Sequence, residues 1–122
     1  MAKRVLIVED VDDVGETLVR LCCEWGFECR IAKDGQEALS AVEEFNPDLM
    51  ILDVGLPKLS GFEVAKHVRK YRPKPTLPIV IVTGRDTARD KETAMTAGAD
   101  HYITKPIDSA KLGELVKSIL SS

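Results

Sequence analysis

The sequence lacks the features that mark membrane-spanning, secreted and multidomain proteins. No apolar run approaches the roughly 20 residues of a transmembrane helix, and the N-terminus leads directly into a strand pattern instead of a signal peptide. The three cysteines have no CxxC spacing and are odd in number, which argues against a disulfide framework. With 20 acidic and 17 basic residues, the charge does not favour direct binding to a nucleic acid or a membrane. We therefore expect a cytoplasmic protein with reduced cysteines.

The length limits the number of domains. A chain of 122 residues can bury about two-thirds of its unfolded surface without disulfides or metals. It contains no internal repeat, low-complexity segment or interdomain linker. We expect residues 1–122 to form a single domain.

Short apolar runs alternate with helical patterns along the whole chain. Four strong runs end at a polar residue, and a weaker one covers residues 27–32. Runs that are apolar on both faces are typical of parallel strands covered by helices on both sides. The order, a strand and then a helix five times over, predicts an α/β fold with a doubly wound, five-stranded parallel sheet.

The residues that end the four strong runs are expected to meet at one edge of the sheet. They are Glu9 with Asp10, Asp53, Thr83 and Lys105. Ligands of open parallel sheets bind at the carboxyl ends of the strands. The pattern therefore predicts a site with two or three carboxylates, a hydroxyl and an ammonium group.

Asp53 is the candidate nucleophile, because it ends a strand and is followed by a loop rich in glycine and proline. Its alternative role is to cap a turn or a helix. Glu9 and Asp10 would add two carboxylates, and three acids this close repel one another unless a cation is bound. Hard oxygen ligands favour Mg²⁺. The two acids could also complement the positive N-terminus of the first helix.

Thr83 and Lys105 would supply what a transferred phosphoryl group needs, a hydroxyl donor and a positive charge near its oxygens. The bond between Lys105 and Pro106 can be cis, which would aim the lysine side chain. Each of these residues is common by itself, so only the combination is informative.

Together these motifs resemble the receiver domain of two-component response regulators, the CheY-like family, over essentially the whole chain. They are Glu9-Asp10, Asp53 followed by Pro57 and Gly61, Thr83-Gly84, and Lys105-Pro106, in the order and spacing of the family. The resemblance implies a flavodoxin-like (βα)5 fold. The strand at 27–32 ends in Ala32 and adds no polar group, which fits a sheet edge and the strand order 2-1-3-4-5.

The resemblance also implies the phosphoryl and metal chemistry of the site. Asp53 would accept a phosphoryl group from a phosphohistidine on a histidine kinase or a histidine phosphotransfer protein. Asp10 would bind Mg²⁺ directly, Glu9 through a water molecule, and Gly55 through its backbone carbonyl. Glu9 stands where the family more often has aspartate, and Gly55 and Arg85 occupy rim positions that tune the lifetime of the phosphoryl group.

Further residues are implied to transmit the signal. Thr83 would be the switch hydroxyl and Lys105 the lysine that binds the phosphoryl group. Tyr102 would turn inward when Thr83 engages that group, although an ordinary half-buried tyrosine is the alternative. The face made by the fourth helix, the fifth strand and the fifth helix would then bind a downstream protein. The domain itself would be a monomer or a phosphorylation-dependent dimer.

Val11 and Val14 extend the apolar stripe of the first helix toward the acidic site, where we expect the phosphodonor to dock; ordinary core packing is the alternative.

Three other functions compete with that of a receiver domain. A flavodoxin-like small-molecule binder would not place acids beside a phosphate, an aspartyl phosphohydrolase would need a second acid at Gly55, and a phosphorylation-independent module would have little use for Thr83 with Lys105. A receiver excised from a larger response regulator or hybrid kinase is equally compatible.

Overall fold

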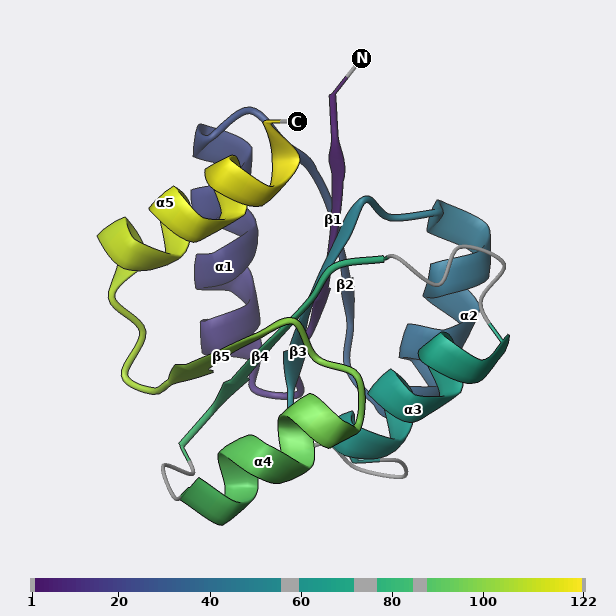
Figure 1. Ribbon diagram of the computed structural model, residues 1–122. Helices are drawn as coiled ribbons and strands as arrows, with labels where there is room; N and C mark the ends of the chain where they lie inside the picture. Colours follow the sequence, from purple (N-terminus) through teal and green to yellow (C-terminus); the bar gives the residue numbers. More distant parts are fainter. Residues whose placement is uncertain (1, 56–59, 72–76, 85–87, 122) are drawn as a thin grey trace.

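Strands and helices alternate along the chain (Figure 1). The structure is a computed structural model and describes residues 2–55, 60–71, 77–84 and 88–121. The strands are β1 (Arg4–Val8), β2 (Glu28–Ala32), β3 (Leu49–Asp53), β4 (Ile79–Thr83) and β5 (His101–Thr104). The helices are α1 (Asp12–Glu24), α2 (Gly35–Phe45), α3 (Gly61–Tyr71), α4 (Ala88–Thr96) and α5 (Ser109–Leu120). The predicted alternation is confirmed.

The five strands form one parallel sheet in the order β2-β1-β3-β4-β5. This confirms the predicted fold class and strand order. Strands β3 and β4 are buried along their whole length, whereas every residue of β5 is half-buried. The run that ends at Lys105 is therefore an edge strand, because only one side of it pairs with another strand.

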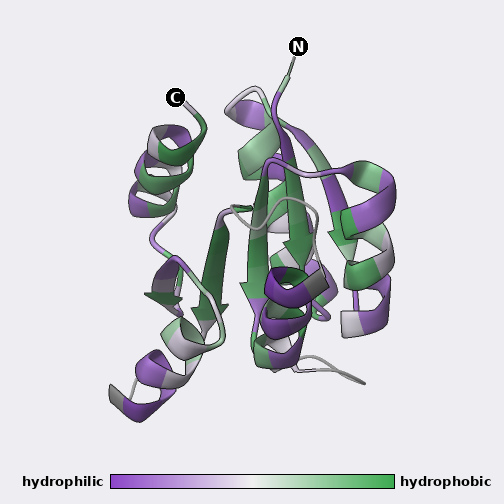
Figure 2. Cartoon of the chain, turned by 45° about the vertical axis from the view of Figure 1, so that its right-hand side comes forward, coloured by the Kyte–Doolittle hydropathy of each residue, from purple (hydrophilic) through white to green (hydrophobic). Residues whose placement is uncertain are grey.

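Helices cover both faces of the sheet, as expected. Val5 and Ile7 of β1 pack toward α1 and α5, while Leu6 and Val8 pack toward α2, α3 and α4. Figure 1 shows α1 and α5 on one side of the sheet and α2 and α3 on the other. In Figure 2 the inner strands are mainly hydrophobic, and the helices carry many hydrophilic residues. Strands that are apolar on both faces thus form the middle layer between two cores.

Several helix ends follow from local chemistry. Asp34 caps α2 by accepting a hydrogen bond of 2.8 Å from the backbone N–H of Glu37. Asn46 ends the same helix in the left-handed region, with φ of 50°. Asp108 caps α5 through the N–H groups of its first turn. No helix in these described ranges is long and apolar enough to cross a membrane.

Candidate functional site

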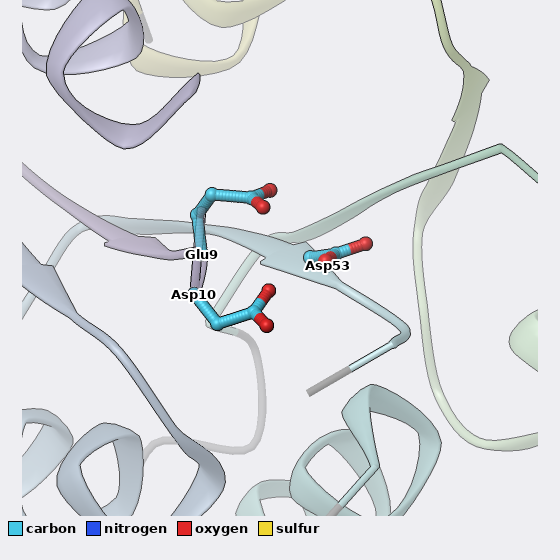
Figure 3. A group of neighbouring side chains, drawn as sticks. All are labelled: Glu9, Asp10 and Asp53. Carbon is cyan, nitrogen blue, oxygen red and sulfur yellow. The ribbon is translucent and has the colours of Figure 1, made fainter. Parts of the chain in front are cut away.

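The polar residues at the strand ends meet at the carboxyl edge of the sheet. Glu9 and Asp10 follow β1, and Asp53 ends β3, which pairs with β1. Each of the three residues offers a carboxylate oxygen within 4.8 Å of the other two. Figure 3 shows the side chains of Glu9 and Asp10 extending to the side on which Asp53 lies. The sheet topology thus assembles the acidic group that the sequence predicts.

Glu9 is the most buried of the acids, with 2% of its surface exposed. Its backbone N–H donates to the carbonyl of Ala32 at 3.0 Å, which fixes the end of β1 against β2. Its Oε1 accepts from the N–H of Val11 at 3.3 Å, and its Oε2 lies 3.3 Å from Nζ of Lys105. Burial raises the pKa of the Glu9 carboxyl, and the nearby charge of Asp53 adds to the increase. Lys105 and the Val11 amide only partly offset these effects.

Lys105 lies within reach of two carboxylates. Its Nζ is 3.3 Å from Glu9 and 3.7 Å from Oδ1 of Asp53. Its backbone N–H donates to the carbonyl of Thr83 at 2.7 Å, which joins the ends of β4 and β5. The Lys105–Pro106 peptide bond, for which the sequence left the cis isomer open, is cis in the structure. The ammonium group stands where it can stabilise added negative charge at Asp53.

The loop after Asp53 depends on a glycine at the start of α3. The N–H of Gly61 donates to the carbonyl of Val54 at 3.0 Å. A Cβ atom at position 61 would collide with the backbone oxygen of Asp53, so that a larger residue would displace the end of β3. Gly55 is exposed, and a Cβ atom at this position would have no neighbour within 4 Å among the described residues.

The acidic group fits a hard cation. Its side-chain donors are all carboxylate oxygens, the ligands that hard cations such as Mg²⁺ and Ca²⁺ prefer. Asp10 is exposed, whereas only 8% of the surface of Asp53 is exposed. A cation there would reduce the repulsion that raises the pKa of Glu9. The site therefore combines a buried carboxylate pair with one carboxylate that is open to solvent.

Thr83 and Tyr102 lie on the neighbouring strands. Thr83 ends β4 and is buried, with 3% of its surface exposed. Tyr102 pairs in register with Ile81 and packs, half-buried, against the core under α2, α3 and α4. The arrangement provides a hydroxyl at the site edge and an aromatic ring farther back along the adjacent strand.

An apolar groove opens beside the acidic group, between α1 and the segment after β5. It has a volume of about 480 Å³ and is lined by Val14, Leu18 and Leu21 on one side. Pro106 and Ile107 line it on the other side. Lys105 also borders it, so the groove reaches the site.

The two valines expected to dock the phosphodonor have different positions. Val14 is half-buried on α1 and lines the groove, so it serves both core and surface. Val11 precedes the helix as its N-cap residue and is 49% exposed. Pro57 and Arg85, which the sequence placed in or near the site, lie outside the described residues.

Sequence reasoning missed three contributions. It assigned no part in the site to β2, yet the carbonyl of Ala32 holds the backbone of Glu9. It used Gly61 only as a motif residue, although the close packing of its Cα explains why glycine stands there. It also missed Ile107, for which the apolar residue after Lys105-Pro106 was the available signal.

Comparison with known proteins identifies the family of the chain. The sequence model of the response regulator receiver domain matches residues 5–117.

The chain belongs to the response regulator receiver domain family.

Relatives of this receiver domain include a transcriptional regulatory protein and a sensory transduction protein. The alkaline phosphatase synthesis transcriptional regulatory protein PhoP of Bacillus subtilis is 39% identical over 98% of this chain and 49% of its own length. The sensory transduction protein RegX3 of Mycolicibacterium smegmatis is 36% identical over 95% of this chain and 50% of its own length. The chain thus spans about half the length of these curated relatives.

Solved structures agree with the family. A putative response regulator from Chloroflexus aurantiacus is 36% identical, with a TM-score of 0.93 and full coverage of both chains. The chemotaxis protein CheY4 of Vibrio cholerae is 28% identical, with a TM-score of 0.92 over 98% of this chain and 100% of that one. The chain is therefore a receiver domain, a regulatory domain of two-component signalling.

Proposed function

We propose that Asp53 accepts a phosphoryl group from a phosphohistidine of a histidine kinase or a histidine phosphotransfer protein. One observation supports this most strongly: the Asp53 carboxylate lies 3.7 Å from the ammonium group of Lys105, beside the carboxylates of Glu9 and Asp10. A nucleophile, a cation and a set of metal-binding oxygens are the parts that phosphoryl transfer needs. The proposal treats residues 1–122 as one unit acting in the cytoplasm.

The transfer needs only the phosphohistidine donor, Asp53 and water. A carboxylate oxygen of Asp53 attacks the phosphorus, the P–N bond to the donor imidazole breaks, and the leaving nitrogen keeps the electron pair and takes up a proton from water. Lys105 stabilises the negative charge on the phosphoryl oxygens. Mg²⁺, held by Asp10, Asp53 and the carbonyl of Gly55, with Glu9 acting through water, would neutralise the remaining charge on these oxygens. In this way the domain promotes its own phosphorylation.

The donor is proposed to dock in the groove beside the site. The groove offers the apolar side chains of Val14, Leu18 and Ile107 next to Lys105, so that a helix of the donor could bury apolar residues there while its phosphohistidine faces Asp53. Val11, exposed above the same end of α1, would extend the contact.

The response starts from the new charge. An aspartyl phosphate adds about two negative charges at the end of β3. Thr83 would donate a hydrogen bond to it from the end of β4, and Tyr102 would turn inward in the space that this movement leaves. The face made by α4, β5 and α5 would then change its affinity for a downstream protein or for a second copy of the domain.

Replacement of Asp53 by asparagine tests the phosphorylation site. Incubation with phosphoramidate and Mg²⁺ should add one phosphoryl group per chain, measured by intact-protein mass spectrometry. The Asp53→Asn variant should remain unlabelled, as should the native protein with a chelator. Asp13→Asn removes an exposed acid near the site and should label normally. Stoichiometric labelling of Asp53→Asn would refute the assignment.

The docking groove has a separate test. Val14→Asp places a charge in the apolar groove and should slow transfer from the phosphorylated histidine donor about tenfold or more, the effect of losing about 1.4 kcal/mol of binding. Labelling by phosphoramidate should be unchanged, because a small donor does not need the groove. An unchanged rate from the protein donor would show that Val14 belongs only to the core.

A further inference from the structure

Helix α4 is anchored unevenly along its length. Of residues 89–93, in its N-terminal part, Asp90 is half-buried and the others are exposed. The buried side chains follow toward the end of the helix and just beyond it: Ala94, Ala97 and Ala99 have at most 6% of their surface exposed. Residues 89–93 therefore have little apolar contact that would hold them in one position.

The end of α4 is held by an arginine from α3. Arg69 donates from Nε to the carbonyl of Gly98 at 2.8 Å, directly after the helix. The same side chain donates to the carbonyl of Leu77, before β4, at 2.6 Å. It also forms an ion pair of 2.7 Å with Asp100, before β5. One guanidinium group thus joins α3, the end of α4 and the starts of two strands.

Asp100 extends this clamp into the sheet. Its Oδ2 accepts a hydrogen bond of 2.8 Å from the N–H of Ile79, the first residue of β4. Its own N–H donates to the carbonyl of Ile79 at 2.9 Å. The starts of β4 and β5 are therefore connected to each other and to Arg69 at the edge opposite the phosphorylation site.

The clamp also explains a glycine. Gly98 has φ of 110°, a region that residues with a side chain rarely adopt. A Cβ atom there would lie 2.5 Å from Cγ of Arg69. Glycine at this position lets the chain turn out of α4 while its carbonyl faces the guanidinium group.

We propose that Arg69 is a positioning residue that holds the C-terminal end of α4 and the start of β5 fixed, so that α4 tilts about this end when Asp53 is phosphorylated. The proposal rests on the proposed function, because phosphorylation supplies the movement. Thr83 lies at the end of β4, and Figure 1 shows α4 running back from there to the start of β5. A shift at Thr83 reaches the weakly held N-terminal part of α4 first, and the clamp prevents the helix from moving as a whole.

Amide hydrogen exchange measured by NMR tests the clamp without any ligand. The amides of residues 97–100 are hydrogen-bonded in the structure and should exchange slowly. In Arg69→Gln they should exchange about tenfold to a hundredfold faster, because a charged hydrogen-bonding group is lost. Arg4→Gln is the matched control, because Arg4 donates to the carbonyl of Phe45 at the end of α2, so that exchange at residues 97–100 should change no more than exchange in the inner strands. Equal exchange at 97–100 in native protein and Arg69→Gln would overturn the clamp.

Beryllium fluoride with Mg²⁺, an analogue of the phosphoryl group, tests the tilt. In the native domain, chemical-shift changes should appear at residues 83–84 and 89–94 and be several-fold smaller at 97–101. In Arg69→Gln they should spread across 97–101, whereas Arg4→Gln should keep the native pattern. Uniform changes along α4 in the native domain, or the native pattern in Arg69→Gln, would refute the tilt.

The two proposals fail in different ways. A native domain without shifts at residues 53–55 and 83–84 on adding the analogue would refute the proposed function, while the exchange data still decide whether Arg69 clamps α4. If Arg69→Gln does not fold, Arg69→Lys keeps the charge but carries its three donors on one nitrogen, whereas Arg69 uses three separate nitrogens for its contacts. It should show the same two effects in weaker form, and native behaviour in Arg69→Lys would refute the requirement for the guanidinium group.

Discussion

The two edges of the sheet use charged residues in opposite ways. At the amino edge, Arg4 and Arg69 each donate to backbone carbonyls at a helix end and pair with an acid. At the carboxyl edge, Glu9 and Asp53 share contacts with Lys105, and Asp10 lies close to both acids. Charges at the first edge are paired within the fold, while at the second edge burial, together with the nearby charge of Asp53, raises the pKa of Glu9.

This difference separates stability from chemistry. A charged group whose hydrogen bonds are complete stabilises the native state. Carboxylates crowded at the end of parallel strands reduce stability until a cation or a ligand balances them, and the same crowding makes the edge a binding site. Substitutions at the amino edge should therefore affect unfolding, and those at the carboxyl edge should affect phosphorylation.

The largest effect is expected at Lys105. Lys105→Met removes the ammonium group near Asp53 and should lower the rate of labelling by phosphoramidate about 100- to 1000-fold, as for the loss of one preorganised electrostatic group. Lys111→Met, at an exposed position of α5, should label at the native rate. The measurement is the initial rate of mass increase. A native rate in Lys105→Met would remove the lysine from the chemistry and weaken the contrast between the edges.

A smaller effect, of the opposite kind, is expected at the amino edge. Arg4→Gln loses the 2.8 Å hydrogen bond to Phe45, the 3.2 Å ion pair with Glu28 and a position over the Phe45 ring. It should lower the free energy of unfolding by about 2 kcal/mol, measured by urea titration, with the labelling rate unchanged. Arg20→Gln, on the exposed side of α1, should be neutral. If Arg4→Gln lowered the labelling rate as well as the free energy of unfolding, the two edges would not be independent.

The smallest effect concerns the pH dependence of Glu9. Because burial and Asp53 raise the pKa of Glu9 above the value of 4.5 in the unfolded chain, this residue stabilises the fold fully only below that pH. The stabilisation is lost as the pH rises through the folded-state pKa. The free energy of unfolding of the native domain relative to Glu9→Gln should therefore fall as the pH rises from 4 toward neutrality.

The pH experiment uses urea titrations of both proteins at each pH without Mg²⁺. Glu16→Gln, at an exposed position of α1, should give a flat difference across the same range. A difference between the native domain and Glu9→Gln that stayed flat or increased with pH would contradict the crowding of carboxylates at this edge.

Much of the fold follows from local sequence patterns. The apolar runs 5–8, 49–52 and 79–82 identify inner strands, because a strand buried on both faces has to be apolar at every position. The polar residues that end these runs indicate the functional edge, because a sheet buried on both faces can present polar groups only where its strands end. The edge position of β5 was less clear, because Tyr102 and Ile103 are as apolar as residues of an inner strand.

The contacts that support the site could not be predicted in this way. Gly61 under the Asp53 carbonyl and the Ala32 carbonyl on Glu9 depend on how a helix or a neighbouring strand approaches the backbone. The Arg69 clamp joins α3 to the end of α4 and the starts of β4 and β5, and the basic pattern of α3 is the same as for an ordinary solvated helix face. Such contacts leave no periodic signal, because each involves one residue and not a repeated position.

The sequence by itself determined the order of the elements, the strand positions of the inner sheet and the chemical types of the site residues, because these depend on spacing and composition along one chain. The tertiary structure decided the distances between Glu9, Asp53 and Lys105, the groove beside them and the unequal anchoring of α4. The physical reason is that these properties arise from pairs of residues far apart in the sequence, such as positions 9 and 105, whose approach depends on the packing of the whole sheet and its helices.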